Sequence, residues 1–299
     1  MNGILPVWKP PNCTSHDVVA KVRRLAKQVK VGHTGTLDPA AQGVLPLCLG
    51  RATRVVEYVQ NLPKTYEGVL TLGIATDTQD QEGKVTRREP VRHVSKDKVI
   101  DVFRRFQGEI EQIPPMYSAV KVKGRRLYDW AREGKEIKRQ ARKVYIYRLE
   151  LVHIRDGNFP QVKFVVQCSK GTYVRTLCVD VGRALGYPAH LSHLVRLKSG
   201  PYSREECVTL TQLEDTPVDL WPSRWLKPID SGLVHFPAHT VPLEDRHAVV
   251  NGRPITLPEG HYQSGTLLRV YTASEFLALY KCDRTGKRAR PVKVFAGNR

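Results

Sequence analysis

Hydrophobic and polar residues alternate along several stretches of the chain. The period-two alternation typical of strands with one buried face covers residues 64–73, 144–155 and 161–169. Asp156, Gly157 and Asn158 separate the last two stretches and predict a hairpin. Short apolar runs between turn residues, which indicate buried strands, lie at 3–8 and 44–49. The pattern therefore predicts a strand-rich sheet.

Three stretches have the helical period instead. The first begins at Thr14, whose spacing to Asp17 predicts a capping box. Its expected apolar face consists of Val18, Val22, Leu25 and Val29. A second helix is expected to bury Val99, Val102, Phe103 and Phe106, and a shorter one covers residues 52–60. These helices are expected to flank the sheet.

Residues 31–46 fit neither pattern. They hold three glycines, two prolines and one charged side chain, Asp38, so they predict a shaped loop. Asp38 has two interpretations from the residues alone. It caps a turn through its own backbone, as Asp before Pro often does, or the loop holds its carboxylate against another group.

The chain is strongly basic, with 48 Lys and Arg against 29 Asp and Glu and a formal charge of +19. This charge favours a polyanionic partner over a basic surface that only aids solubility. Residues 121–143 alone hold ten basic and three acidic side chains, interleaved with Tyr128 and Trp130. Such a segment suits phosphate binding and nucleotide stacking, although an exposed helix with scattered charges would show a similar composition.

Length and composition predict two domains. A chain of 299 residues is long for one compact unit, and a stretch rich in Pro, Trp and acidic residues at 214–225 interrupts the pattern. From about residue 239 the segments become short and alternating, as at 265–271 and 275–282. We therefore expect a domain over 1–238 and a small strand-rich domain over 239–299.

Six cysteines without a C-x-x-C pair indicate reduced thiols and a cytoplasmic protein. We expect no signal peptide and no membrane span, because no window approaches 18 apolar residues. The acidic loop at 76–83 lacks the rest of a calcium-binding pattern, so no metal site is expected.

The segment GHTGTLDPAAQGVLPLCLGRATR, which contains Asp38, resembles the catalytic motif of the TruB family of tRNA pseudouridine synthases, which isomerise uridine 55 in the T-loop. Similar family segments recur as QIPPMYSAVKVKGRRLY, KGTYVRTL and AHLSHLVR. The segment KPPNCTSHDVV also resembles the family, but Asn12 and Cys13 replace the usual Gly and apolar residue. Asn tolerates the left-handed conformation, so the turn is expected to survive.

The resemblance implies a catalytic role for three residues. Asp38 is the expected catalytic carboxylate, and Arg175 is expected to pair with it, lower its pKa and keep it ionised. Tyr66, in the segment KTYEG, is expected to stack on the target base and to serve in proton transfer at C5. Without the resemblance, Arg175 would read as part of a structural salt bridge and Tyr66 as a core residue.

Further residues are implied to bind substrate. Tyr173 and Leu194 are expected to wall the pocket, His33 to fill the gap that the flipped base leaves, and Lys9 to contact the substrate. A lone His or a buried Leu would more often be structural. In the family the region 121–143 belongs to a mobile loop that clamps the RNA.

The implied fold is α+β, a mixed and largely antiparallel sheet with flanking helices, the pseudouridine synthase fold. The segment from Asn251 to Ile255 resembles a PUA-type RNA-binding module, a small β-barrel. The implied partner is the T-arm stem-loop of tRNA, bound by a monomer without a cofactor. Two alternatives remain open, a non-catalytic RNA-binding or RNA-folding protein and a synthase acting on another RNA.

Overall fold

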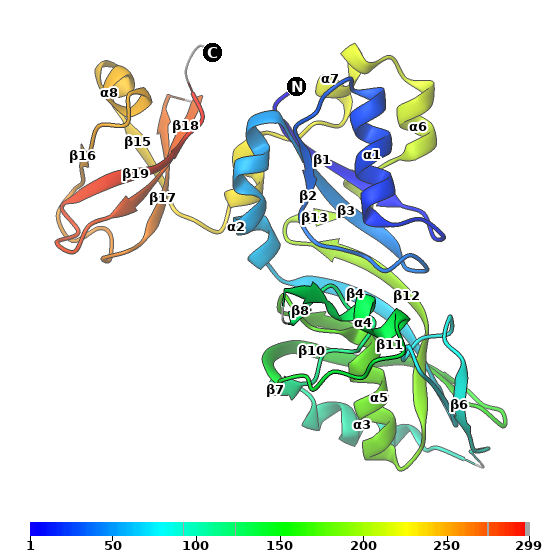
Figure 1. Cartoon of the computed structure of the whole chain (residues 1–299). Coiled ribbons are helices and arrows are strands. Elements are labelled where there is room, and N and C mark those ends of the chain that lie inside the picture. The colour runs from blue at the N-terminus through cyan, green and yellow to red at the C-terminus, as the bar shows by residue number, and fades with distance from the viewer. Residues whose placement is uncertain (92, 123, 274, 297–299) are drawn as a thin grey trace.

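The computed structural model describes residues 1–91, 93–122, 124–273 and 275–296. Its centre is a ten-stranded mixed sheet (Figure 1). Eight strands follow one another in the order β14 (Val208–Thr209), β1 (Gly3–Lys9), β3 (Gln42–Leu49), β12 (Ala189–Ser199), β4 (Lys64–Leu72), β11 (Gln161–Cys168), β10 (Arg142–Arg155) and β7 (Gly108–Gln112). Two short strands complete it, β2 (Val31–His33) beside β3 and β13 (Tyr202–Ser203) beside β12. The expected mixed α+β architecture is confirmed.

The pairing is antiparallel except at two places. β1 and β14 are parallel, and β3 and β12 are parallel at the middle of the sheet. The second pairing is short, with Val195 opposite Gln42 and Arg196 opposite Gly43. Because the loop of Asp38 leads directly into β3, this junction brings it beside β12.

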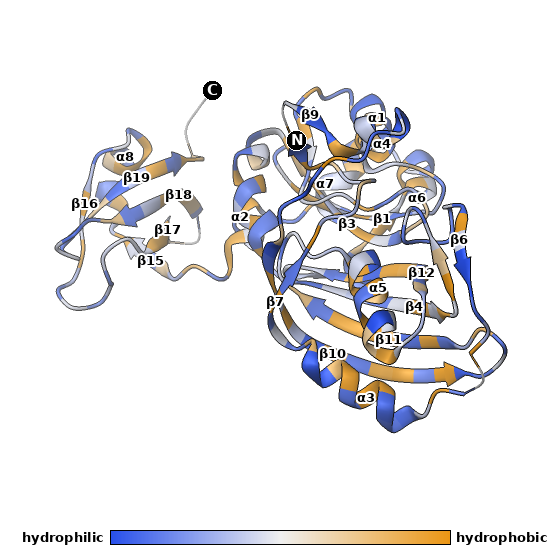
Figure 2. Cartoon of the chain, turned by 60° about the horizontal axis from the view of Figure 1, so that its bottom comes forward, coloured by the Kyte–Doolittle hydropathy of each residue, from blue (hydrophilic) through white to orange (hydrophobic). Residues whose placement is uncertain are grey.

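Each half of the sheet has its own core. Around β1 and β3, the valines of α1 (Ser15–Leu25) pack with Leu45, Leu47 and Trp221. Around β4, β11 and β10, the core is closed by α3 (Lys96–Arg105) and α5 (Val174–Leu185). In Figure 2 these two helices lie over β10 and β11, where hydrophobic positions recur along both strands.

Helix α1 shows how far the hydrophobic pattern holds. Thr14 caps it through the expected box with Asp17, and Val18 and Val22 are fully buried. The helix ends at Leu25, however, so Val29 is not on its face and is 86% exposed. Asn12 has the left-handed conformation that its turn requires, with φ of 61°.

Shorter elements connect the larger ones. The helix expected over 52–60 is a 3₁₀ segment, Gly50–Val55, followed by α2 (Val56–Asn61). Two small hairpins pair β5 (Ile74–Thr76) with β6 (Val85–Arg88) and β8 (Lys121–Val122) with β9 (Arg125–Arg126). The remaining helices of this part are α4 (Leu127–Arg132), α6 (Leu210–Asp215) and α7 (Trp221–Arg224).

The last part of the chain forms a separate five-stranded sheet. Its order is β15 (Ala238–Val241), β17 (Leu267–Thr272), β18 (Glu275–Cys282), β19 (Arg288–Val294) and β16 (Ile255–Thr256), with α8 (Arg246–Val250) beside it. It contacts the 3₁₀ segment before α2, where Arg51 Nη1 donates to Phe295 O at 2.7 Å and Arg54 Nη1 donates to Val294 O at 2.6 Å.

Candidate active site

The loop that carries Asp38 is held from two sides. Ser15 Oγ, in the first turn of α1, accepts from Leu37 N at 2.9 Å and lies 3.2 Å from Leu37 O. Lys9 Nζ donates to Pro39 O at 3.0 Å. A turn closes after Asp38, because Ala41 N donates to Asp38 O at 3.1 Å. The loop backbone is therefore fixed before any substrate arrives.

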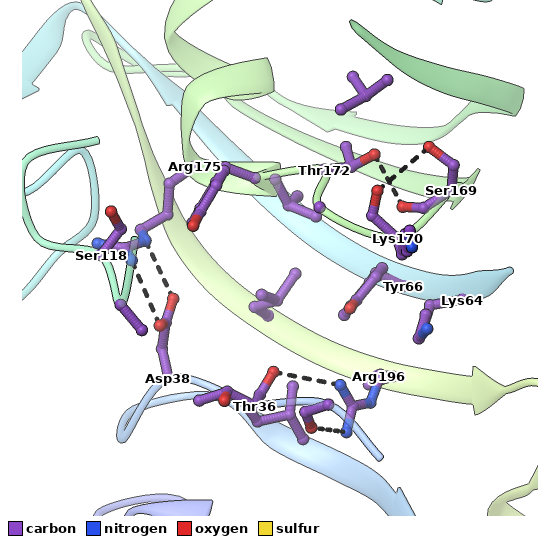
Figure 3. Close-up of a pocket in the computed structure, with 18 of the residues that line it drawn as sticks. Thr36, Asp38, Lys64, Tyr66, Ser118, Ser169, Lys170, Thr172, Arg175 and Arg196 are labelled. Atoms are coloured by element: carbon purple, nitrogen blue, oxygen red, sulfur yellow. Dashed lines mark hydrogen bonds and ion pairs between the residues drawn. The ribbon is translucent and has the colours of Figure 1, made fainter. Parts of the chain in front are cut away.

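Arg175 binds Asp38 side-on (Figure 3). Nε lies 3.0 Å from Oδ2 and Nη2 lies 3.3 Å from Oδ1. The arginine side chain is 6% exposed, whereas that of Asp38 is 42% exposed and faces the pocket. The sequence prediction that the two residues meet is confirmed, and the paired geometry fixes both oxygens of the acid.

The other donors of Arg175 fix two further loops. Nη1 donates to Thr78 O at 3.1 Å and Asp80 Oδ2 at 3.2 Å, and Nη2 also donates to Tyr117 O at 3.0 Å. A guanidinium has five N–H donors. The three contacts named here, together with the two to Asp38, use all five. The acidic loop at 76–83 therefore helps to position the arginine.

The pKa of Asp38 is set by opposing effects. Removal from bulk water raises this pKa above its ordinary value, Arg175 lowers it, and the neighbouring Asp80 carboxylate raises it again. The arginine thus lowers the pKa of Asp38 as the sequence predicted, but burial and the Asp80 carboxylate outweigh it, and the net pKa is raised. The sequence-based expectation considered the arginine alone, so it missed the net direction.

Tyr66, Tyr173 and Leu194 lie around the same pocket as Asp38 and Arg175. Tyr66 comes from β4, Leu194 from β12, and Tyr173 is the N-cap residue of α5, two positions before Arg175. Burial raises the pKa of Tyr66, so its hydroxyl is protonated at neutral pH. The structure thus brings five residues named from the sequence to one place.

His33 and Lys9 are placed differently. His33 Nδ1 accepts from Gly35 N at 3.2 Å, and its ring packs edge-on against His16. Burial and the adjacent His16 lower the pKa of His33 to about 4, which leaves a neutral ring. Lys9 is fully buried, and its ammonium donates to Pro10 O, Cys13 O and Pro39 O at 2.7–3.0 Å. This placement differs from the expected substrate contact, because all three N–H donors of the Lys9 ammonium are bonded to backbone carbonyls of the protein.

Arg196 is a structural residue to which sequence reasoning assigned no role. It is 1% exposed on β12 and donates to Val44 O, Thr36 O and Gly35 O at 2.7–3.3 Å. Its backbone also packs tightly on Gly43, where a β-carbon would lie 2.3 Å from Arg196 O. The sequence signal was available, because Arg196 ends the segment AHLSHLVR and Gly43 belongs to the Asp38 motif.

The pocket has a volume of about 530 Å³, which is within the range of small-ligand sites. Among the described residues that line it, Asp38 is the only carboxylate. The cationic lining residues are Lys64, Arg142, Lys143, Lys170, Arg175 and Arg196. The cavity therefore suits an anionic ligand with a planar group.

The basic segment at 121–143 borders this pocket. Arg125 lies 4.3 Å and Lys135 5.6 Å from the centre of the Trp130 ring, and Arg126 and Arg132 lie over Tyr128. Both rings are thus covered by cations of the same segment. Lys123, which was counted in the basic segment, lies outside the described residues.

Two further expectations concern absences. Among the residues that the structure describes, no three His, Cys, Asp or Glu side chains gather in a way that could hold a metal ion. Within the same residues, no helix has the length and apolar character needed to cross a membrane.

Comparisons with known proteins agree with these observations. Residues 23–174 match the model of the TruB family pseudouridylate synthase N-terminal domain, and 175–234 match the tRNA pseudouridylate synthase B C-terminal domain. The tRNA pseudouridine synthase B of Geobacillus thermodenitrificans is 46% identical over 99% of this chain and 100% of that protein. The Bacillus subtilis protein of that name is 45% identical over 94% of this chain and 93% of its own length.

Solved structures show the same fold. A chain of an H/ACA RNP bound to a substrate RNA containing 2'-deoxyuridine superposes with a TM-score of 0.75 at 28% identity, covering 99% of this chain and 85% of that one. A chain of a Cbf5-Nop10-Gar1 complex gives a TM-score of 0.73 at 30% identity, covering 99% of this chain and 84% of that one. With its family models, its relatives and its fold in agreement, this chain belongs to the TruB family of pseudouridine synthases.

Proposed function

We propose that the protein isomerises uridine 55 in the T-loop of tRNA to pseudouridine, with Asp38 as the catalytic carboxylate. The observation that carries this proposal is the side-on pair of Arg175 with Asp38 at the wall of a cation-lined pocket that also holds Tyr66. The family membership and the names of the relatives support an isomerase acting on tRNA.

The isomerisation requires few catalytic groups. The bond from N1 to C1′ of the uridine breaks, the uracil turns within the pocket, and C5 bonds to C1′. The proton that leaves C5 is balanced by one that N1 gains, and neither an oxidant nor a phosphate donor takes part. Asp38 either attacks the base or sugar, or stabilises positive charge on the sugar, and both roles use its ionised form. Arg175 supports that form while fixing both of its oxygens.

The uracil must first leave the RNA stack. Tyr66 supplies an aromatic face for the flipped base, with Tyr173 and Leu194 completing the apolar wall. Tyr66, which lies in the same pocket, serves in proton transfer at C5 as a relay: its protonated hydroxyl takes the proton from C5 as it releases its own, and N1 gains one proton in the same reaction. The neutral ring of His33, on β2 next to the catalytic loop, fills the space that the base vacates.

The proposed RNA partner is the T-arm stem-loop. The cations of the pocket and of the 121–143 segment supply the phosphate contacts. We assign 1–238 to the catalytic domain and 239–299 to a PUA-type RNA-binding domain, whose curled five-stranded sheet supports the assignment. The protein is proposed to act as a monomer in the cytoplasm.

Tritium release from a T-loop transcript with C5-labelled uridine tests the proposal. The wild-type protein should release tritium, and Asp38→Asn should reduce the rate by at least about 10³-fold while still binding the RNA. Full turnover by Asp38→Asn would overturn the assignment of the carboxylate.

The two alternatives give different outcomes in the same assay. A non-catalytic RNA-binding or RNA-folding protein would bind the stem-loop and release no tritium. A synthase for another RNA would modify that RNA faster than the T-arm transcript, so a competition between transcripts identifies it.

A further inference from the structure

The pocket continues beyond the residues that surround Asp38. On the side of Tyr66 away from the Asp38–Arg175 pair, its wall is made by Lys64, Ser169, Lys170 and Thr172 (Figure 3). Arg142, the first residue of β10, also lines the pocket. Among the described lining residues, this part contains cations and hydroxyls and no carboxylate. A uracil held at Asp38 would leave this region open.

Lys64 is the anchor of this region. It is the first residue of β4, two positions before Tyr66, and it is only 5% exposed. Its ammonium donates to Gln60 O and to Leu62 O, the latter at 2.7 Å. These bonds use two of the three donors of an ammonium, and the side chain borders the cavity. One donor is therefore available to a ligand there.

The charges around Lys64 are unfavourable for a buried cation. Burial lowers the pKa of Lys64 to about 8, and the neighbouring Arg196 and Lys170 lower it as well. Cys168, which is paired with Lys64 in the sheet, offers little compensation, because burial raises the pKa of its thiol to about 11. A buried ammonium beside other cations is costly unless an anion joins it.

We propose that Lys64, together with Lys170 and Arg142, binds a phosphodiester group of the RNA strand next to the target nucleotide. This inference rests on the proposed function, because an RNA strand with its base at Asp38 brings a phosphate on either side of that base. The phosphate provides the counter-charge that the protein lacks at this point. It also fixes the sugar of the target from the side opposite Asp38.

A purely structural role for Lys64 is the competing explanation, because its two carbonyl bonds tie the end of α2 to β4. A double-mutant cycle on RNA binding separates the two. Wild type and Lys64→Met are titrated with T-arm stem-loops that carry a neutral methylphosphonate at single positions around the target uridine. Lys96→Met, an exposed residue on α3, is the matched control.

We expect one methylphosphonate position at which wild-type affinity falls about 10-fold while Lys64→Met loses almost nothing further. Lys96→Met should lose as much as the wild type at that position. If the losses from Lys64→Met and from methylphosphonate are additive at every position, the proposal is overturned and the lysine is structural.

A second measurement needs only the wild-type protein, in case Lys64→Met fails to fold. RNA affinity should decrease between about pH 7 and pH 9, because Lys64 loses its proton in that range. The decrease should vanish for the stem-loop with methylphosphonate at the sensitive position. Equal pH dependence for both RNAs would contradict the proposal. Both experiments measure binding, so their outcome is independent of the tritium assay that tests the proposed function.

Discussion

Asp38 and Asp80 bind the same guanidinium from different sides. Arg175 presents Nε and Nη2 to Asp38, and Nη1 to Asp80 Oδ2 at 3.2 Å. Asp80 is 18% exposed and also accepts from Thr78 Oγ1 and Glu82 N, so its own position is fixed. Asp80 therefore has two effects on the catalytic acid. It orients the arginine, and its negative charge raises the pKa of Asp38.

Asp80→Ala removes the orienting contact. We expect kcat to fall about 10- to 100-fold with little change in KM, because Asp80 does not touch the base and a displaced arginine misplaces Asp38. Single-turnover assays with the T-arm transcript measure this effect. Glu82→Gln, an exposed change in the same loop, should leave kcat unaltered. A similar loss in both variants would indicate a general disturbance of the loop.

Asp80→Asn removes the charge and keeps an oxygen that can accept from Arg175. Because the Asp80 charge raises the pKa of Asp38, the variant should have a lower pKa at Asp38. The acid limb of the kcat profile should therefore move to lower pH. A pH–rate series between about pH 4 and pH 8 shows the shift, and an unchanged acid limb would rule out electrostatic coupling between the two acids.

Asp38→Asn should change the pH dependence of stability as well as abolish turnover. The folded-state pKa of Asp38 is raised, so the protonated acid stabilises the fold below pH 3.8, and this contribution is lost as the pH rises through the folded-state value. The asparagine variant has no such loss. Its urea midpoint should therefore rise relative to that of the wild type between about pH 4 and pH 7. A difference that is constant with pH would contradict the raised pKa.

Tyr66→Phe separates stacking from proton transfer. The phenyl ring keeps the aromatic face, so RNA affinity should stay within about twofold, while loss of the hydroxyl should slow turnover about 10²- to 10⁴-fold. Filter binding and tritium release on the same transcript provide the two values. Normal turnover by Tyr66→Phe would limit Tyr66 to stacking.

Lys9→Met tests the structural role that the contacts indicate. Three carbonyl groups lose their donor inside the protein, and unfolding free energy should fall by about 3 kcal/mol. The dependence of RNA affinity on salt should be the same as in the wild type, because no phosphate contact is lost. A shallower salt dependence with unchanged stability would return Lys9 to the substrate-binding residues.

The sequence contained enough to predict the main strands and the pairing of Asp38 with Arg175. The strands were predictable because hydrophobic positions recur with period two: the buried positions alternate throughout β11, and in β10 they alternate up to the bulge after Ile146. β4 departs from the pattern at its end, where Leu70, Thr71 and Leu72 are all buried. The pairing followed from the family resemblance, since 137 positions separate the two residues and no local pattern connects them.

The supporting contacts could not be predicted in the same way. Asp80 stood in a polar loop whose partner lies 95 positions away, and only the packed structure shows which loop reaches Arg175. Lys9 was expected to contact the substrate, because burial of a lysine against three carbonyls leaves no signal in a single sequence. Val29 continued the helical period by position alone, whereas the helix had already ended at Leu25.

The contact from Arg175 to Tyr117 O links the catalytic acid to the segment that leads into the basic region. Every side-chain N–H of Arg175 has an acceptor, so the side chain can move only if hydrogen bonds to several loops break together. If RNA entry displaced Tyr117, Arg175 would lose one of its hydrogen-bond acceptors, and the position of Asp38 would be less well fixed. The backbone at Tyr117 and the carboxylate of Asp38 thus share a single guanidinium, so a change at one would alter the support of the other.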